Sequence, residues 1–155
     1  MLIEKAWAKL HGSYCAIRKG QSILAMPHFT GAAARQYNHT FPDQGSRQHF
    51  WEMLKDAVDK KYVVTSSTLG EDEAHTNTSS GEDLLSGHSY CLEKAFTSAI
   101  GNRGQLQIIQ LRNPWGRDVG GNACLQGLSA DIRQACLQPE QEGQGIVFVT
   151  FAEYM

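Results

Sequence analysis

Two residues of this chain combine side-chain types and a spacing that could support acid–base chemistry. They are His88, in the segment SGHSY, and Asn113, in the segment QLRNPWG. An imidazole can exchange a proton at one ring nitrogen while the other nitrogen donates a hydrogen bond that holds the ring in place. An Asn amide oxygen can accept that bond. We therefore predict that Asn113 accepts the Nδ1 proton of His88 and leaves Nε2 free for chemistry.

Two strand-like segments would bring these residues together. Residues 84–96 and 104–113 contain aliphatic and β-branched residues with polar residues between them, and a Gly-Asn-Arg-Gly turn precedes the second segment. An Asn before Pro favours extended backbone, and Pro cannot continue a hydrogen-bond ladder, so the second strand should end at Asn113. Antiparallel pairing of the two strands would place Asn113 beside His88.

The side chains next to these residues should also share their surroundings. Alternate residues of a strand face the same side of the sheet, so His88 and Tyr90 should lie on one side. Trp115, two residues beyond Asn113, would cover the His88–Asn113 hydrogen bond and exclude water from it. A lone His near an Asn at a strand end is also compatible with a purely structural role. The pattern by itself leaves both interpretations open.

The remaining segments predict helices first and strands later. Residues 2–11 and 47–60 have apolar residues on one face, and the stripe of the second segment consists of Phe50, Trp51, Leu54 and Val58. Residues 12–34 are rich in turn-forming residues and predict irregular structure, whereas residues 62–68 and 145–151 predict strands. This order indicates an α+β fold, with an antiparallel β-sheet subdomain flanked by helices.

The composition is that of one globular domain and excludes several classes of partner. The 155 residues are 41% hydrophobic with a net charge of −2, so neither nucleic acid nor a membrane is expected as a partner. The N-terminal segment carries charges within its apolar pattern, unlike a secretory signal. The four cysteines form no C-x-x-C pair, and the six histidines form no i, i+4 pair. We therefore expect reduced thiols, no metal site, and an intracellular, cytoplasmic location.

Residues 69–83 differ in character from their surroundings. The segment LGEDEAHTNTSSGED is acidic, small and almost free of apolar residues. Such a composition predicts a flexible surface loop inserted before the His88 segment. The loop could gate a neighbouring cleft or contact a partner, or it could be a tolerated insertion without a function of its own.

Four segments together resemble a known protease family. They occur in the order EKAWAKLHGSY, HFTGAA, LLSGHSYCL and IIQLRNPWG. In this order and spacing they resemble the second half of the papain-like core of the calpains, the half that carries the catalytic His and Asn. The resemblance implies that residues 1–155 form subdomain II, the C-terminal half of a calpain-like catalytic core. It also implies an intracellular cysteine endopeptidase that acts on polypeptides.

The resemblance gives roles to four residues. His88 and Asn113 would be catalytic, with Asn113 orienting His88 as the base of a Cys–His–Asn system. The thiolate of such a system attacks the scissile carbonyl, and the imidazolium then protonates the leaving amine. Gly87 and Trp115 would contact the bound substrate beside His88.

The chain departs from the family by lacking a nucleophile. In papain-like enzymes the Cys precedes the His by roughly 130–150 residues, a distance that runs back beyond Met1. Cys91 should face away from His88, and none of the other three cysteines lies in a helix-start context that would lower its thiol pKa. We therefore expect the partner of this chain to be an upstream Cys-bearing half, and the chain alone to be inactive.

A second departure concerns calcium, for which the family uses acidic residues after RNPWG. Val119 and Gln126 stand where acids are expected, and Gln144 and Ile146 replace those of a later motif. Calcium needs six to eight oxygen ligands, and Asp118 alone does not restore the site. No cofactor or metal is therefore expected, although a shifted alignment could bring in Glu140 or Glu142.

Two hypotheses about function follow from these patterns. In the first, the chain is the His/Asn half of an active calpain-like protease. In the second, it is a non-catalytic calpain-like binding or regulatory module whose parent has lost the nucleophile. A Cys in a Gly-x-Cys-Trp segment upstream would favour the first hypothesis, whereas Ser or Lys in its place would exclude it.

Overall fold

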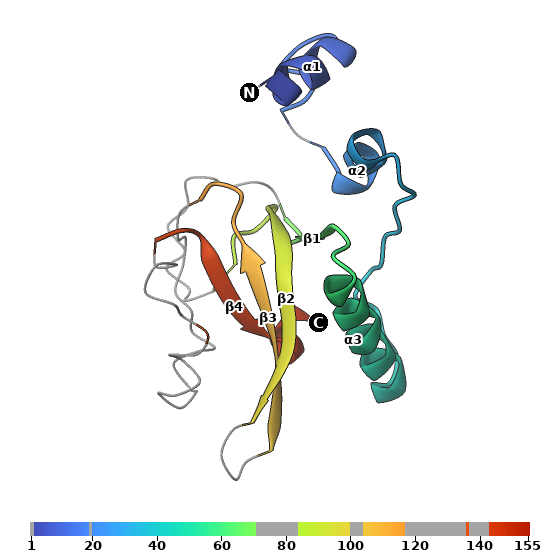
Figure 1. Ribbon diagram of the computed structural model, residues 1–155, viewed down its shortest axis with the longest axis vertical. Coiled ribbons are helices and arrows are strands. Elements are labelled where there is room, and N and C mark those ends of the chain that lie inside the picture. The colour runs from blue at the N-terminus through green and yellow to red at the C-terminus, as the bar shows by residue number, and fades with distance from the viewer. Residues whose placement is uncertain (1, 19, 71–83, 100–103, 117–135, 137–142) are drawn as a thin grey trace. The chain divides into compact units, whose positions relative to one another are not determined.

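A computed structural model of the chain describes residues 2–18, 20–70, 84–99, 104–116, 136 and 143–155. The chain divides into two compact units, Met1–Asn38 and His39–Met155 (Figure 1). Each unit is described by itself below. The residues of the candidate site all belong to the second unit.

The N-terminal unit contains two helices. Helix α1 (Leu2–Leu10) confirms the first predicted helix, but α2 (Ser22–Thr30) lies where irregular structure was predicted. Pro27 lies inside α2, where it removes a single backbone hydrogen bond. Gly31, with φ of 70°, closes the helix by donating its N–H to the carbonyl of Pro27 at 2.9 Å. The turn-forming residues therefore bound a short helix.

The second unit is built on a four-stranded antiparallel sheet, which confirms the predicted α+β class. Its strands are β1 (Val64–Ser67), β2 (Ser89–Ala99), β3 (Gln105–Arg112) and β4 (Ile146–Thr150), and they lie in the order β1-β2-β3-β4 (Figure 1). The last strand ends before Phe151, which begins the short helix α6 (Phe151–Tyr154). A Thr150–Glu153 capping box favours this helical turn over a longer strand.

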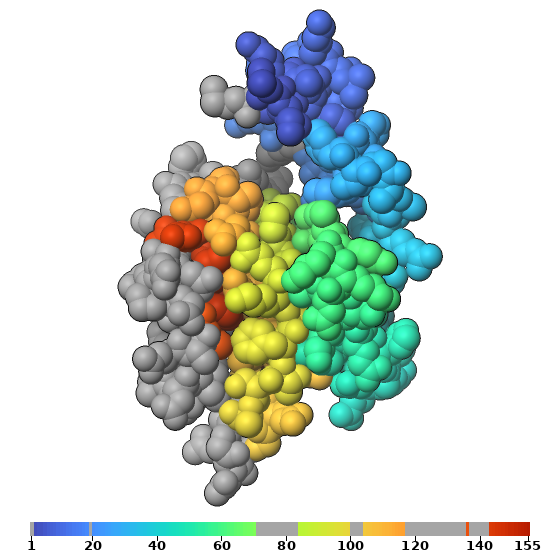
Figure 2. Space-filling model, in the orientation of Figure 1, coloured from blue at the N-terminus to red at the C-terminus, as the bar shows by residue number. Residues whose placement is uncertain are grey.

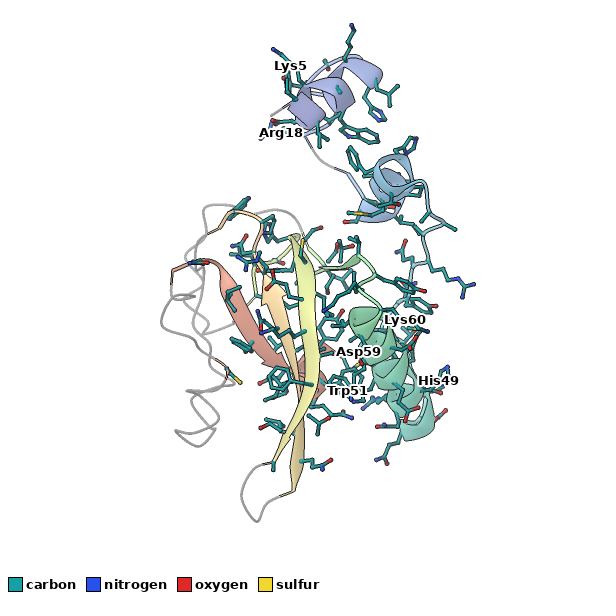
Figure 3. All side chains as sticks on the ribbon, viewed as in Figure 1. Lys5, Arg18, His49, Trp51, Asp59 and Lys60 are labelled. Atoms are coloured by element: carbon teal, nitrogen blue, oxygen red, sulfur yellow. The ribbon has the colours of Figure 1, made fainter. Side chains whose placement is uncertain are left out.

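Helix α3 (Gln44–Asp59) packs on β2 and supplies the larger of two apolar cores. Figure 2 shows the residues of α3 directly against those of β2, and Figure 3 shows Trp51 between α3 and the sheet. The predicted stripe is confirmed, since Trp51 and Leu54 are only 3% and 4% exposed. The helix begins three residues earlier than predicted because Asp43 caps it, accepting a hydrogen bond from the Ser46 N–H at 2.8 Å.

The opposite side of the sheet carries a smaller core. Alternate residues of β3 divide between the two sides: Ile109 and Leu111 join the core under α3, whereas Ile108 packs with Ile146 and Phe148. Strand β3 is therefore buried on both faces along its second half. No helix in the part of the chain that the structure describes has the length and apolar character needed to cross a membrane.

We expect Leu54→Ala to destabilise the second unit by about 2–5 kcal/mol, because it leaves a cavity between α3 and the sheet. The free energy of unfolding from urea titration measures this loss. Asp59→Ala, an exposed change on the same helix, is the matched control and should shift the value by no more than about 0.5 kcal/mol. Equal effects of the two changes would contradict the described packing of α3.

The cap of α3 should make stability depend on pH. The hydrogen bond from the Ser46 backbone lowers the pKa of Asp43 from its ordinary value of 3.8. A carboxylate with a lowered pKa in the folded state stabilises above its unfolded pKa, and this contribution is lost as the pH falls through the folded pKa. Asp43→Asn keeps the cap acceptor but does not titrate. We expect the urea midpoint of the wild type, relative to Asp43→Asn, to be constant near neutral pH and to fall below about pH 4. A difference that stays constant in acid would contradict this role of Asp43.

Candidate active site

The β2–β3 pair places His88 and Asn113 at one end of the sheet. His88 immediately precedes β2 and Asn113 immediately follows β3, and the register sets Cys91 opposite Arg112. Both side chains are buried, with 8% of His88 and 1% of Asn113 exposed. The predicted meeting of the two residues is thus found in the structure, although His88 lies just before the strand rather than within it.

The hydrogen bond between them uses a different nitrogen from the one predicted. Nε2 of His88 lies 3.0 Å from Oδ1 of Asn113, and the backbone N–H of Trp115 donates to the same oxygen at 3.0 Å. Because a backbone N–H requires an acceptor, the amide of Asn113 must present its oxygen, and Nε2 of His88 must then donate. The prediction that Nδ1 makes this bond is wrong, because the Nε2 side of the imidazole ring faces Asn113.

The consequence is that Nδ1 is the nitrogen left for chemistry. Within the described part of the chain, Nδ1 of His88 has no hydrogen-bond partner. The tautomer that carries its proton on Nε2 leaves a lone pair on Nδ1, which can accept a proton from another group. The hydrogen bond therefore orients the His88 ring, with the roles of its two nitrogens exchanged from those predicted.

Two aromatic rings enclose the imidazole. The ring of Trp115 lies 4.4 Å from that of His88 between centroids, and the ring of Tyr90 meets it edge-on at 4.9 Å. Tyr90 is 2% exposed, and burial raises the pKa of its phenol. Trp115 is 39% exposed, so its ring covers His88 on one side and is open to solvent elsewhere. Both placements agree with the predicted positions of these residues.

Backbone contacts hold both ends of the pair. Asn113 donates its backbone N–H to the carbonyl of Gly145 at 2.7 Å, which ties the end of β3 to the start of β4. Gly87, before His88, has a φ of 62° that favours glycine, and its N–H donates to the carbonyl of Leu69 at 3.1 Å. The predicted contact of Gly87 with a ligand stays a prediction.

Thr68 also contacts His88, and the sequence analysis missed it. Its side-chain Oγ1 accepts a hydrogen bond from the backbone N–H of His88 at 2.9 Å, and its own N–H donates to the His88 carbonyl at 2.9 Å. The two residues are twenty positions apart, with the segment 71–83 between them. Since the contact depends on how the chain closes around that segment, neither composition nor periodicity could have indicated it.

No thiol among the described residues of the second unit is suited to act as the nucleophile. Cys91 is exposed and, by alternation from Tyr90, faces away from His88, as predicted. Cys136 is buried in the core on the other side of the sheet, and burial raises the pKa of its thiol. Cys15 belongs to the N-terminal unit, and Cys124 lies outside the described residues.

Several predictions fall on residues that the structure does not describe. They are most of the predicted acidic loop (71–83) and the positions weighed for calcium at 118, 119, 126, 140 and 142. Ile146 is described, and it packs in the smaller core. Where side chains are placed, three or more His, Cys, Asp or Glu residues nowhere gather into a group able to hold a metal ion.

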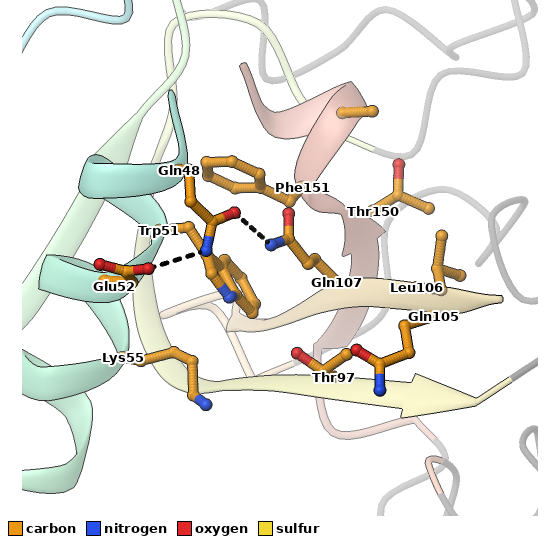
Figure 4. A pocket seen from close by; sticks show the side chains of 11 residues that line it. Gln48, Trp51, Glu52, Lys55, Thr97, Gln105, Leu106, Gln107, Thr150 and Phe151 are labelled. Atoms are coloured by element: carbon orange, nitrogen blue, oxygen red, sulfur yellow. Dashed lines mark hydrogen bonds between the residues drawn. The ribbon is translucent and has the colours of Figure 1, made fainter. Parts of the chain in front are cut away.

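A separate hollow of about 540 Å³ lies between α3 and the β2–β3 pair (Figure 4). Trp51 and Phe151 lie at its base. Gln48 of α3 connects the helix to the sheet, because its side-chain oxygen accepts a hydrogen bond from Gln107 of β3 at 3.3 Å. It also donates one to Glu52 on the same helix at 3.0 Å. The described residues that line this hollow include neither His nor Cys. The hollow therefore lacks the acid–base groups of the His88 site.

Comparison with known proteins agrees with the geometry. The family model described as calpain family cysteine protease matches residues 1–124. Calpain-9 of Homo sapiens is 35% identical over 121 residues, which cover 75% of this chain and 16% of that protein. The catalytic subunit of calpain-2 from Gallus gallus is 32% identical over 150 residues, covering 92% and 21%. Calpain-A of Drosophila melanogaster is 29% identical over 157 residues, covering 99% and 18%.

The chain thus spans between 16% and 21% of the length of these three relatives. The segments that suggested the resemblance, including those around His88 and Asn113, lie within residues 1–124 or overlap them. That match extends over most of the sequence rather than over one short motif. The chain belongs to the calpain family of cysteine proteases.

Proposed function

We propose that His88 and Asn113 are the base and its orienting residue in a Cys–His–Asn endopeptidase, whose Cys lies in an upstream half that this chain does not contain. The observation that carries the proposal is the buried bond between Nε2 of His88 and Oδ1 of Asn113, at 3.0 Å. Family membership supplies the reaction class, cysteine-dependent peptide hydrolysis. The described residues place no suitable thiol beside His88, and the chain by itself is expected to be inactive.

In the proposed mechanism, Nδ1 of His88 removes the thiol proton, and the resulting imidazolium stabilises the thiolate. The thiolate attacks the scissile carbonyl carbon, and its C–S bond forms as the carbonyl electrons move to oxygen. The Nδ1 proton then passes to the leaving amine as the C–N bond breaks. In the second half, Nδ1 takes a proton from water as the water oxygen attacks the thioester carbon. The C–S bond then breaks and releases the carboxylic acid product, and the Nδ1 proton returns to the sulfur.

Asn113 contributes to both half-reactions through orientation. Its oxygen holds Nε2–H, so the proton exchanged in each step can reside only on Nδ1. The backbone N–H of Trp115 keeps that oxygen pointed at His88, and the Trp115 ring shields the bond from water. Gly87 and the exposed surface of Trp115 are the proposed contacts for the polypeptide substrate.

The proposal assigns a cytoplasmic location and no cofactor to this half. We also propose that the segment 69–83 is an acidic surface insertion that precedes the His88 site. A parent in which Ser or Lys replaces the upstream Cys would instead make the chain a non-catalytic module. That outcome is separated from the proposed function by the following experiment.

The first test is labelling of the full-length parent protein with an irreversible thiol-directed epoxide. We expect labelling in the wild type, and a rate at least about 100-fold lower in His88→Ala, because the thiolate loses its proton acceptor. Reactions run in chelator and in calcium show whether the pair works without that ion.

His49→Ala is the matched control for this labelling. His49 is exposed on the side of α3 that faces away from the sheet (Figure 3), so its loss should leave the labelling rate unchanged. Absence of labelling in the wild type under both conditions would establish a non-catalytic module. Labelling that is equally fast in His88→Ala would remove His88 from the mechanism.

A second test concerns the tautomer of His88 in the 155-residue chain. In the neutral form of the ring, the imidazole ¹⁵N shifts of the wild type should report a proton on Nε2 alone. Asn113→Ala removes the acceptor and should move the shifts toward the average of the two tautomers. Gln107→Ala, which removes an amide elsewhere on β3, should not change them. A wild-type ring protonated on Nδ1 would contradict the proposed division of roles.

A further inference from the structure

The contacts of Thr68 form a closed set around the turn that precedes His88. Oγ1 of Thr68 donates to the carbonyl of Leu85 at 2.5 Å and accepts from the N–H of His88 at 2.9 Å. A hydroxyl has one proton, and the carbonyl of His88 is farther away at 3.2 Å. The Thr68 proton therefore goes to Leu85, and this single hydroxyl bridges the first and last residues of the Leu85–His88 turn.

Three further hydrogen bonds, made with Tyr90 and Leu69, hold the turn. The phenol oxygen of Tyr90 accepts from the Leu85 N–H at 2.8 Å, so both backbone groups of Leu85 are bonded. The carbonyl of Leu69 accepts from the N–H of Gly87 at 3.1 Å and from Oγ of Ser86 at 2.8 Å. Each of these bonds fixes the backbone at or just before His88.

Gly70 shows how closely the two sides of this stem approach one another. Its φ is 116°, and a Cβ added to it would lie 2.2 Å from Oγ of Ser86 and 3.6 Å from the backbone N of Gly87. A side chain there would displace the Ser86 hydroxyl and would be strained at this φ. Residues 68–70 and 85–88 therefore form one hydrogen-bonded stem, and Thr68 is its member with direct bonds to His88.

The position of the imidazole depends on this stem. The hydrogen bond from Nε2 of His88 to Asn113 joins the stem to the end of β3. Its geometry therefore depends on where the stem holds the backbone of His88. The β1–β2 ladder ends at Ser67 opposite Ser89, one residue short of His88. The next hydrogen bonds toward His88 are those of Thr68.

We propose that Thr68 is a positioning residue for His88, whose hydroxyl closes the Leu85–His88 turn and so aims the imidazole at Asn113 and Nδ1 at the reacting thiol. The catalytic part of this statement rests on the proposed function. The part about the imidazole concerns this chain alone and is tested without any reaction.

Three variants separate the hydroxyl of Thr68 from its shape. Thr68→Val keeps the shape and removes the hydroxyl, which leaves the Leu85 carbonyl and the His88 N–H without their partner. Thr68→Ser keeps the hydroxyl. Ser67→Ala is the matched control, because Oγ of Ser67 bonds Oγ of the half-buried Ser89 at 2.9 Å, outside the Leu85–His88 turn.

The first measurement is the imidazole ¹⁵N spectrum of His88 in the 155-residue chain. Thr68→Val should shift it toward mixed tautomers, whereas Thr68→Ser and Ser67→Ala should match the wild type. A Thr68→Val spectrum identical to that of the wild type would overturn the proposal. Should Thr68→Val not fold, amide exchange in the wild type decides the matter. The His88 amide must exchange slowly, and exchange at the rate of a free amide would overturn the role of Thr68.

The second measurement is peptide hydrolysis by the full-length parent. Thr68→Val should lower kcat by roughly 10- to 100-fold with little change in KM, since misplacement of a catalytic group affects the chemical step. Thr68→Ser should restore it. If His88→Ala is as active as the wild type, the proposed function fails. The ¹⁵N spectrum still decides whether Thr68 positions the imidazole of His88. If His88 is required and Thr68→Val is fully active, only the positioning role fails.

Discussion

The antiparallel pairing of β2 with β3 is the constraint on which the candidate site depends. It runs from Cys91 opposite Arg112 to Ala99 opposite Gln105, and it puts the residue before β2 and the residue after β3 at the same end of the sheet. Slippage by one position would turn every side chain of a strand to the other face. His88 and Asn113 would then be too far apart to form their hydrogen bond, and Ile109 and Leu111 would no longer face the core under α3. The same register therefore sets both the packing and the chemistry.

An irregularity within this pairing is itself held by side chains. The register shifts by one residue between Leu92 and Lys94, so that Glu93 forms a bulge. Its carboxylate accepts hydrogen bonds from Gln110, at 2.9 Å, and from Arg112, two β3 residues near Asn113. Glu93 connects the bulge in β2 to the last residues of β3. It therefore opposes a shift of the β2–β3 register at the end where such a shift would separate His88 from Asn113.

Buried polar groups require partners, and this requirement explains the arrangement around His88. Asn113 is 1% exposed, and its side-chain oxygen serves both the imidazole and the backbone of Trp115. The Leu85–His88 turn bonds Thr68, Tyr90 and Leu69. Groups that are hydrogen-bonded inside the protein have little freedom to reorient, which suits the role proposed for His88.

Local sequence patterns are enough to predict the helices and strands in which apolar residues recur regularly. The stripe of α3, the β2 and β3 segments, and the Asn-Pro-Trp ending were sufficient to predict the sheet and the meeting of His88 with Asn113. These predictions succeeded because apolar periodicity and the backbone limits of Pro act over a few residues. The ordered motifs around them identified the family. The pattern does not predict helix α2, because Pro27 and Gly31 are typical of irregular structure, although Gly31 in fact caps the helix.

Only the tertiary structure decided which nitrogen of His88 meets Asn113 and what fixes the His88 backbone. Ring orientation depends on the Trp115 N–H that turns the amide of Asn113, and on the rings of Trp115 and Tyr90 on either side. The bonds of Thr68 join residues twenty positions apart, across a segment whose sequence carries no periodic signal. Such contacts follow from loop closure and from packing in three dimensions, which a one-dimensional pattern of residue types does not encode.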